Sequence, residues 1–225
     1  MDHTSRMVAL LAAMRRERNG AVADGMRCYG AACGLNYGVS LPTIRNIARA
    51  EKPDHAFACY LYRQEVRELR LAALHIAEPR MLTTPELPAW EAGIVNSEVA
   101  EEAAFALLSR TPLLPELFER WTVAAEPLPA YAALMAAARW PEAPAEWAAR
   151  AMDVVRRQTE AAAAGRQPDY AARLTAQGAV ALLASLGGRN EKNRQAVLRA
   201  VGSGGDTPAE NYLREELAWR LQPLQ

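Results

Sequence analysis

The sequence has little of the residue types that mark metal-binding and disulfide-rich proteins. It holds only 3 Cys among its 225 residues, and their number and spacing indicate neither a disulfide framework nor a Cys/His zinc site. We expect the three histidines, His3, His55 and His75, to be isolated from the cysteines and from one another. We therefore expect no metal site and no cofactor.

Long apolar runs and an excess of charge of one sign are also absent. The N-terminal apolar run is too short for a signal sequence, and arginines follow it instead of preceding it. No stretch approaches the ~18 apolar residues of a membrane-spanning helix, so the sequence predicts a soluble, cytoplasmic protein with no membrane partner. Because 26 Lys and Arg balance 26 Asp and Glu, binding to nucleic acid would require local arginine patches.

Alanine, by contrast, is abundant, at 47 of the 225 residues. Alanine has the highest helix propensity and lets neighbouring backbones approach closely. Alternation of β-branched residues, which would indicate strands, is absent. The composition therefore predicts an all-α protein with closely packed helices.

The first fifty residues are predicted to form an N-terminal cap. A helical period covers residues 5–18 and places Val8, Leu11 and Met14 on one face, and Gly20 ends it. Residues 25–38 are rich in glycine, including Gly30, and are predicted to form a structured loop, after which Pro42 begins a short helix. Further helices are predicted over residues 54–62, 65–76, 85–95, 98–110, 113–122, 127–139, 144–163, 168–186, 190–201 and 208–221.

These helices form about five pairs over residues 51–225. The second helices open near Glu65, Glu98, Pro127, Pro168 and Pro208, at spacings of about 33, 29, 41 and 40 residues. Helix pairs at such intervals indicate an α-solenoid of HEAT or armadillo type, here a single repeat domain over residues 1–225. A plain helical bundle is the alternative. At one junction, Asn96 or Ser97 is predicted to cap the helix that follows.

Four segments of the sequence follow one another in the order and at the spacing of matching segments in a known protein family. They are YGAACGLNYGVSLPTIRNIA, VRELRLAAL, NSEVAEEAAFALLSRTP and SLGGRNEKNRQAVLRAV. Over roughly residues 15–201 the sequence resembles the DNA alkylation repair proteins with HEAT-like repeats. The resemblance implies a curved solenoid that holds duplex DNA in its concave face. It also implies the chemistry of the best-known members, glycosylases that remove cationic N-alkylated purines with Trp side chains and an Asp carboxylate.

That chemistry needs electrostatic stabilisation of an oxocarbenium-like sugar and aromatic contact with the cationic base. The resemblance places the family's Trp at Trp90, but Ile94 stands where the Asp is expected and Tyr131 where an Arg is expected. No Asp occurs between Asp54 and Asp153, so only a glutamate such as Glu98 can replace it. The candidates for catalysis are therefore Trp90, Glu98 and Tyr131, and glycosylase activity stays open.

Six arginines are predicted to contact DNA: Arg45, Arg67, Arg70, Arg139, Arg173 and Arg189. Arg67 and Arg70 lie early in a second helix, which a solenoid turns toward its concave side; the alternative is an exposed charged face paired with Glu65 and Glu68.

Charge varies along the chain. Residues 1–50 hold 7 basic and 3 acidic side chains, residues 51–150 hold 9 and 15, and residues 151–200 hold 8 and 4. The sequence predicts a DNA-binding repair-family protein, with a non-catalytic protein-interaction scaffold as the alternative.

Overall fold

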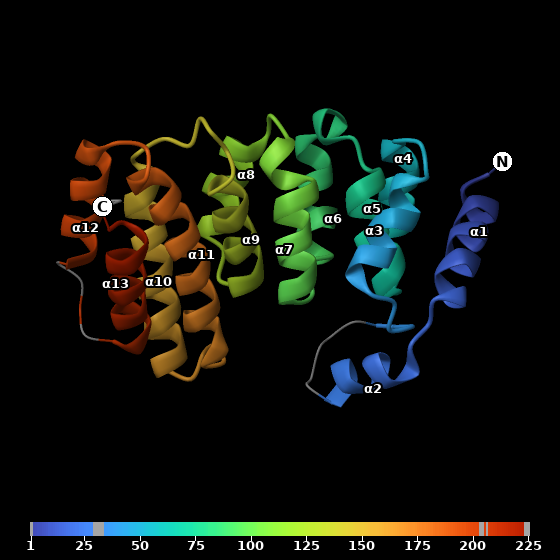
Figure 1. The fold of residues 1–225 in the computed structure, drawn as a ribbon, viewed down its shortest axis with the longest axis horizontal. Coiled ribbons are helices and arrows are strands. Elements are labelled where there is room, and N and C mark those ends of the chain that lie inside the picture. The colour runs from blue at the N-terminus through green and yellow to red at the C-terminus, as the bar shows by residue number, and fades with distance from the viewer. Residues whose placement is uncertain (1, 29–33, 203–204, 206, 223–225) are drawn as a thin grey trace. The chain divides into compact units, whose positions relative to one another are not determined.

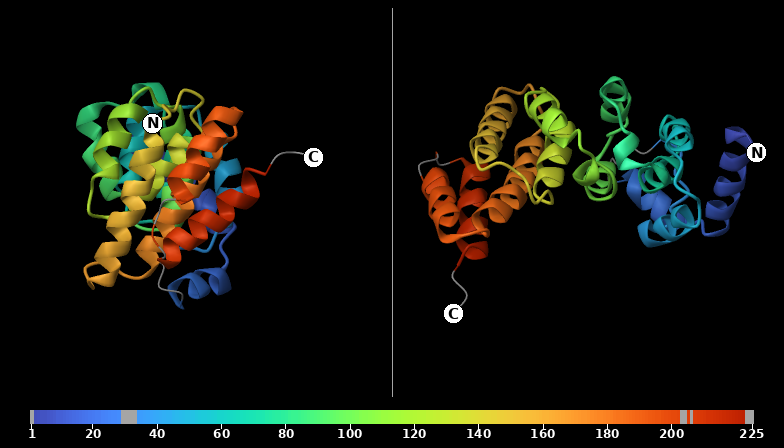
Figure 2. Two further views of the ribbon diagram at one scale, coloured as in Figure 1. Left: turned by 90° about the vertical axis from the view of Figure 1, so that its left-hand side faces the viewer. Right: turned by 90° about the horizontal axis from the view of Figure 1, so that it is seen from above.

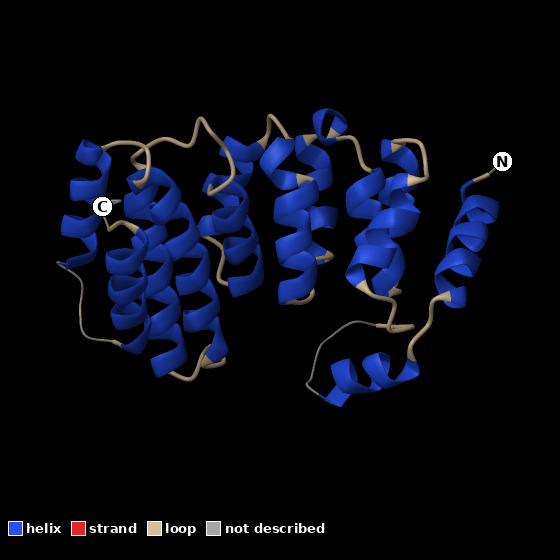
Figure 3. Ribbon diagram, viewed as in Figure 1, coloured by secondary structure: helices blue, strands red, loops and turns tan. Residues whose placement is uncertain are grey.

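The computed structural model describes residues 2–28, 34–202, 205 and 207–222. Across those ranges all regular elements are helical, and the one departure is an isolated bridge that joins Gly34 and Leu35 to Val66 (Figure 3). The predicted residues Gly30 and Cys33 lie outside the described ranges. Contacts divide the chain into two compact units, Met1–Leu113 and Leu114–Gln225, and the predicted single domain over residues 1–225 stays a prediction.

The described residues of unit 1 form seven α-helices and three short 3₁₀ turns, and most of these elements are labelled in Figure 1. They are α1 (His3–Arg16), α2 (Gly20–Cys28), α3 (Leu41–Arg49), α4 (His55–Tyr62), α5 (Arg67–Ile76), η1 (Pro79–Met81), η2 (Thr84–Glu86), α6 (Leu87–Ala92), α7 (Ser97–Ala106) and η3 (Leu108–Arg110). Helix α5 packs against α3, α4 and α7, so nine of its ten residues are buried.

In the part of unit 2 that the structure describes there are six α-helices, and Figures 1 and 2 show them packed side by side. They are α8 (Leu114–Thr122), α9 (Pro127–Ala137), α10 (Trp147–Ala163), α11 (Tyr170–Gly187), α12 (Glu191–Gly202) and α13 (Pro208–Arg220). Helices α8 and α9 form one pair and α10 and α11 the next, and α9 also packs along α11.

Small residues let α9 and α11 approach closely. A Cβ added at Gly178 of α11 would lie 3.0 Å from Cδ2 of Tyr131 and 3.1 Å from Cβ of Leu134, both on α9. On α9 itself, Ala130, Ala133 and other alanines have no exposed surface. The high alanine content therefore allows dense packing between successive helix pairs. Small side chains let neighbouring helices approach until their interface is as closely packed as a protein interior.

The predictions for the first fifty residues need two corrections. In α1 the buried side chains are Leu10 and Met14, so the prediction is confirmed at Met14, whereas Val8 is 58% exposed and was wrongly placed on the apolar face. Residues 20–28 form helix α2, not a turn followed by loop, because Gly20 and Gly25 adopt helical conformations. The loop after the undescribed residues does need glycine: Gly38 has a φ of 70°, in the left-handed region.

The later helices lie close to their predicted ranges, with two breaks. The segment predicted over residues 85–95 begins as η2 and continues as α6, and the segment over 98–110 is divided at Leu107 between α7 and η3. Asn96 is the cap of α7: its side-chain oxygen accepts a hydrogen bond from the Val99 amide at 2.9 Å. Among the described helices, none has both the length and the apolar character needed to cross a bilayer.

Candidate functional site

A layer of paired charges crosses α3, α5 and α7 in unit 1. Arg67, at the start of α5, is 2% exposed; its Nε donates to Oε2 of Glu98 on α7 at 2.7 Å, and its Nη1 donates to the Val39 carbonyl at 2.9 Å. Burial opposes the charged form of Arg67, but the hydrogen bonds and charges of Glu98 and Glu68 outweigh it, so its pKa is raised. Arg67 thus carries its charge inside the protein.

Glu68 attaches the loop before α3 to helix α5. Its fully buried Oε1 accepts hydrogen bonds from the backbone amides of Tyr37 at 3.2 Å and Val39 at 3.3 Å. The same oxygen accepts a hydrogen bond from Nη1 of Arg67 at 3.1 Å. A buried carboxylate needs such donors, because an unpaired one would be costly.

Glu102 forms the other half of the layer. It is 2% exposed and accepts a hydrogen bond from Nε of Arg45 on α3 at 2.8 Å, and its Oε1 also contacts Nε2 of His75. Burial would raise the pKa of Glu102, but the hydrogen bonds from His75 and Arg45 outweigh it and lower the pKa to about 2. Glu102 is therefore ionised, with both of its oxygens occupied by cationic or neutral donors.

Arg70 is also buried, at 8% exposed, and its Nε donates to the carbonyl of Tyr62, the last residue of α4, at 3.4 Å. The stretch Arg67–Arg70 is therefore not the exposed charged face weighed from the sequence, and that interpretation is wrong. The sequence could not show this, because the ion-pair partner of Arg67 lies 31 residues away on α7.

Trp90 and Tyr131, the aromatic candidates, are packing residues. Trp90 is 3% exposed, its ring lies 4.3 Å from that of Tyr62, and its carbonyl accepts a hydrogen bond from the Tyr62 hydroxyl at 3.1 Å. Tyr131 is likewise 3% exposed and lies against Gly178 within unit 2. Ile94, where the family's Asp is expected, is also buried.

Three of the predicted arginines are exposed, all in unit 2: Arg139, Arg173 and Arg189. Arg139 follows α9 and donates to the Met135 carbonyl at 2.7 Å. Arg189 follows α11 and donates to the carbonyls of Trp140 and Ala143, at 3.3 and 2.5 Å. The ends of α9 and α11 therefore present two arginines close together.

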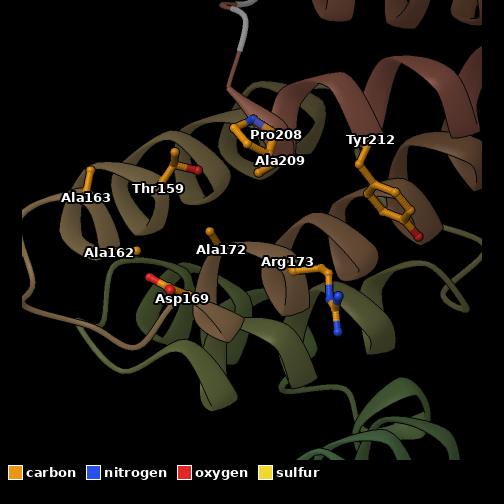
Figure 4. A pocket seen from close by; sticks show the side chains of 9 residues that line it. All are labelled: Thr159, Ala162, Ala163, Asp169, Ala172, Arg173, Pro208, Ala209 and Tyr212. Atoms are coloured by element: carbon orange, nitrogen blue, oxygen red, sulfur yellow. The ribbon is translucent and has the colours of Figure 1, made fainter.

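Arg173 lies in the first turn of α11, at the rim of a cavity of about 460 Å³ (Figure 4). The cavity lies between α10, α11 and α13, with Tyr212 and Pro208 contributed by α13. Its nine lining residues are Thr159, Ala162, Ala163, Asp169, Ala172, Arg173, Pro208, Ala209 and Tyr212. Most of these side chains are small or apolar, so the cavity suits an apolar group with charges at its edge.

His55, Cys59 and Glu86 come together in unit 1, although the sequence suggested that the histidines were isolated from the cysteines. His55 and Cys59 lie on α4, and Glu86 closes η2. The pKa of the Cys59 thiol is raised to about 11, mainly because the thiol is buried and secondly because the negative charge of Glu86 lies nearby. The four-residue spacing of His55 and Cys59 was visible in the sequence, but Glu86 was not predictable as their neighbour.

Comparison with protein families matches residues 10–156 to the family described as DNA alkylation repair enzyme. The chain belongs to this family. The match spans more than half of the sequence and includes the whole charged layer of α3, α5 and α7, whereas Arg173 and Arg189 lie beyond it. No curated protein matches this family member in sequence.

A solved structure shares the fold of this alkylation repair family member. It is described as "A new family of proteins related to the HEAT-like repeat DNA glycosylases with affinity for branched DNA structures". The two share 14% sequence identity with a TM-score of 0.68, and the match covers 98% of this chain and 96% of the other. The likeness confirms the predicted all-α HEAT-like repeat fold over the plain helical bundle.

Proposed function

We propose that this alkylation repair family protein binds branched DNA through exposed arginines and does not itself cleave the glycosidic bond. The observation that supports this most directly is the state of the α7 glutamates. Glu98 is bound by Arg67, and Glu102 is bound by Arg45 and His75. The affinity for branched DNA is stated for the structural neighbour and is proposed here for this chain.

Base removal would require a carboxylate whose charge is available to the sugar as positive charge develops there. Glu98 could offer its charge only by leaving Arg67, which is 2% exposed. Leaving Arg67 would break both hydrogen bonds that join the two side chains and would leave the buried guanidinium with Glu68 as its remaining acidic partner, which opposes the release of Glu98. The positions of Trp90 and Tyr131, both buried, support the same proposal.

DNA contact is proposed for Arg139, Arg173 and Arg189, which are exposed and all lie in unit 2, and not for Arg45, whose guanidinium is bound by Glu102. Arg173 lies in the first turn of α11 and Arg189 lies two residues beyond its last residue, Gly187, and at 1.5 Å of rise per residue the helix extends about 21 Å from Arg173 to Gly187. Guanidinium groups bind phosphate in a bidentate manner and retain their charge. One rigid helix thus offers two phosphate contacts, which suits two DNA arms.

The DNA proposal is tested by fluorescence anisotropy with a four-way junction, a fork and a linear duplex of matched sequence, at low and high salt. We expect the junction to bind more tightly than the linear duplex. The triple variant Arg139→Ala, Arg173→Ala and Arg189→Ala should bind it at least about tenfold more weakly. Arg156→Ala is the matched control, because Arg156 is an exposed arginine of α10 paired with Asp153. An absence of junction binding at low salt contradicts the proposal.

The absence of base removal is tested separately by incubating the protein with alkylated DNA and measuring released purines by chromatography. We expect no release above that of the DNA alone. If purines are released and the Glu98→Gln variant no longer releases them, the protein is a glycosylase in which Glu98 replaces the family's Asp.

A protein-interaction scaffold is the second candidate, supported by the cavity between α10, α11 and α13. Its small apolar lining could accept an apolar side chain of a partner protein. This candidate takes precedence if neither junction nor duplex binds at low salt.

A further inference from the structure

His55, Cys59 and Glu86 bring three different metal-ligating groups to one point in unit 1. An imidazole nitrogen, a thiol sulfur and a carboxylate oxygen all lie within 4.8 Å of one another. We propose that these three side chains bind one zinc ion. The proposal departs from the expectation drawn from the sequence, in which no metal site was foreseen.

Two of the three distances between the ligand atoms fit tetrahedral coordination, and the third, between the imidazole of His55 and Sγ of Cys59, is at most 4.8 Å. Oε1 of Glu86 lies 3.3 Å from Nε2 of His55 and 3.5 Å from Sγ of Cys59. Zinc bonds of about 2.0–2.1 Å to nitrogen or oxygen and about 2.3 Å to sulfur place tetrahedral ligand atoms about 3.3–3.6 Å apart. Glu86 therefore already lies at ligand spacing from both His55 and Cys59.

Local structure holds two of the ligands on one face of α4. His55 begins the helix and Cys59 follows one turn later, a spacing that stacks side chains on the same face. The first turn is fixed by Asp54, whose carboxylate accepts a hydrogen bond from the Phe57 amide at 2.9 Å. The pair is thus positioned by ordinary helix geometry.

Glu86 is oriented by Thr83. Its Oε2 accepts hydrogen bonds from the Thr83 amide at 2.8 Å and from the Thr83 hydroxyl at 2.7 Å. Both carboxylate oxygens lie 3.3 Å from Nε2 of His55, and Oε1 also faces Sγ of Cys59. Carboxylate ligands of metals are commonly held by such outer hydrogen bonds.

The surroundings leave room for a fourth ligand. A cavity of about 10 Å³, roughly the space of one water molecule, is lined by Cys59, Glu86, Trp90 and neighbouring residues. Nε2 of His55 faces the Glu86 carboxylate at 3.3 Å and is the nitrogen assigned to the ion, and Nδ1 is buried with no hydrogen-bond partner among the described residues. We assign a water molecule to the fourth position.

The ligand set selects zinc among the common divalent ions. A mixed nitrogen, sulfur and oxygen set suits this borderline-soft cation, whereas Mg²⁺ and Ca²⁺ prefer oxygen alone. Binding replaces the proton of the Cys59 thiol, which passes to solvent, and forms a zinc–sulfur bond with no change of oxidation state. The ion would join α4 to the segment that carries Trp90.

The site is tested on the full-length protein after treatment with a chelator. Titration with Co²⁺, a spectroscopic substitute for zinc, should produce a thiolate-to-cobalt absorption band that saturates at one equivalent. Calorimetry with Zn²⁺ should give the same stoichiometry. Cys59→Ser should abolish the band, and both Cys59→Ser and His55→Ala should weaken zinc binding by about 100-fold or more.

Matched controls come from the same residue types elsewhere. The double variant Cys28→Ser, Cys33→Ser retains Cys59 as its one cysteine and should keep the absorption band, and His3→Ala should bind zinc as the unchanged protein does. Circular dichroism confirms that each variant is folded. The proposal is overturned if the unchanged protein binds no zinc, or if the double cysteine variant loses the band. Junction binding is measured independently, so the two proposals can fail separately.

Discussion

Single charged residues in unit 1 are stable in the interior because each has a partner. The clearest case is Glu102, whose pKa is lowered from 4.5 to about 2 by His75 and Arg45 despite its burial. Because the pKa of Glu102 is lower in the folded than in the unfolded protein, the ionised carboxylate stabilises the fold at pH values above the unfolded pKa of 4.5. This stabilisation is lost as the pH falls from 4.5 toward 2.

Glu102→Gln should therefore lower the free energy of unfolding at pH 7 by about 3 kcal/mol. It should also flatten the loss of stability between pH 4.5 and 2. Urea unfolding at a series of pH values measures both effects. Glu191→Gln is the control, because Glu191 pairs with Arg194 at the surface and should leave stability unchanged. An unaltered acid profile in Glu102→Gln would contradict the assignment.

Gly93 shows how closely one residue is constrained by another. A Cβ at this position would lie 2.1 Å from Cε1 and 2.5 Å from Cζ of Tyr62, the ring that packs on Trp90. Gly93→Ala should destabilise the protein by about 1–3 kcal/mol through overpacking. Gly25→Ala in α2 meets no atom within 4 Å and should stabilise by about 0.5–1 kcal/mol. The melting temperatures of both variants are compared with that of the unchanged protein. An equal shift in the two variants would contradict the close packing of Gly93 against Tyr62.

The candidate site was predictable only in part. The residue types of the charged layer were visible, and Arg45, Arg67 and Glu98 were singled out from sequence. Their pairing was not, because Arg45 and Glu102 lie 57 residues apart and meet only when α3 and α7 both pack against α5.

At the scale of helices, boundaries were predictable where a residue with a defined backbone role marks them. Pro127 and Pro208 begin α9 and α13, as proline in the first turn predicts. Helix α2 was missed because Gly20 and Gly25 favoured a break and because Ala23 is its one buried residue, so no apolar period was visible. Weakly buried helices leave little pattern in a sequence.

The start of α7 allows a direct test of capping. Asn96→Ala removes the acceptor for the Val99 amide and should cost about 1 kcal/mol, whereas Ser97→Ala should have little effect because Ser97 lies inside the helix. Asn96→Asp keeps the acceptor and serves as the control. Chemical denaturation measures the three variants, and an equal loss from Ser97→Ala would contradict the assignment of Asn96 as the cap.

For the whole molecule, the balance of charges limits how DNA can be bound. With 26 basic and 26 acidic side chains there is no general excess of positive charge, so affinity must come from a few local contacts. Each neutralised phosphate contributes about −0.9 to the slope of log affinity against log salt.

Three arginines therefore predict a slope of about −3 for the junction. Replacing Arg139, Arg173 and Arg189 together by alanine should bring the slope close to zero, while Arg156→Ala should leave it unchanged. Anisotropy titrations over a range of salt concentrations measure it. A much steeper slope would show that other basic residues carry the contact.

The burial of α9 has a consequence for the order in which unit 2 opens. Nine of its eleven residues are buried, whereas in α12 only Val197 and Val201 of twelve are. Amide hydrogens of α9 should exchange with deuterated solvent only when the whole unit unfolds, and those of α12 through local fluctuations. Exchange at α12 should thus precede exchange at α9, with the alanine-rich helix among the last parts of the unit to lose its protons.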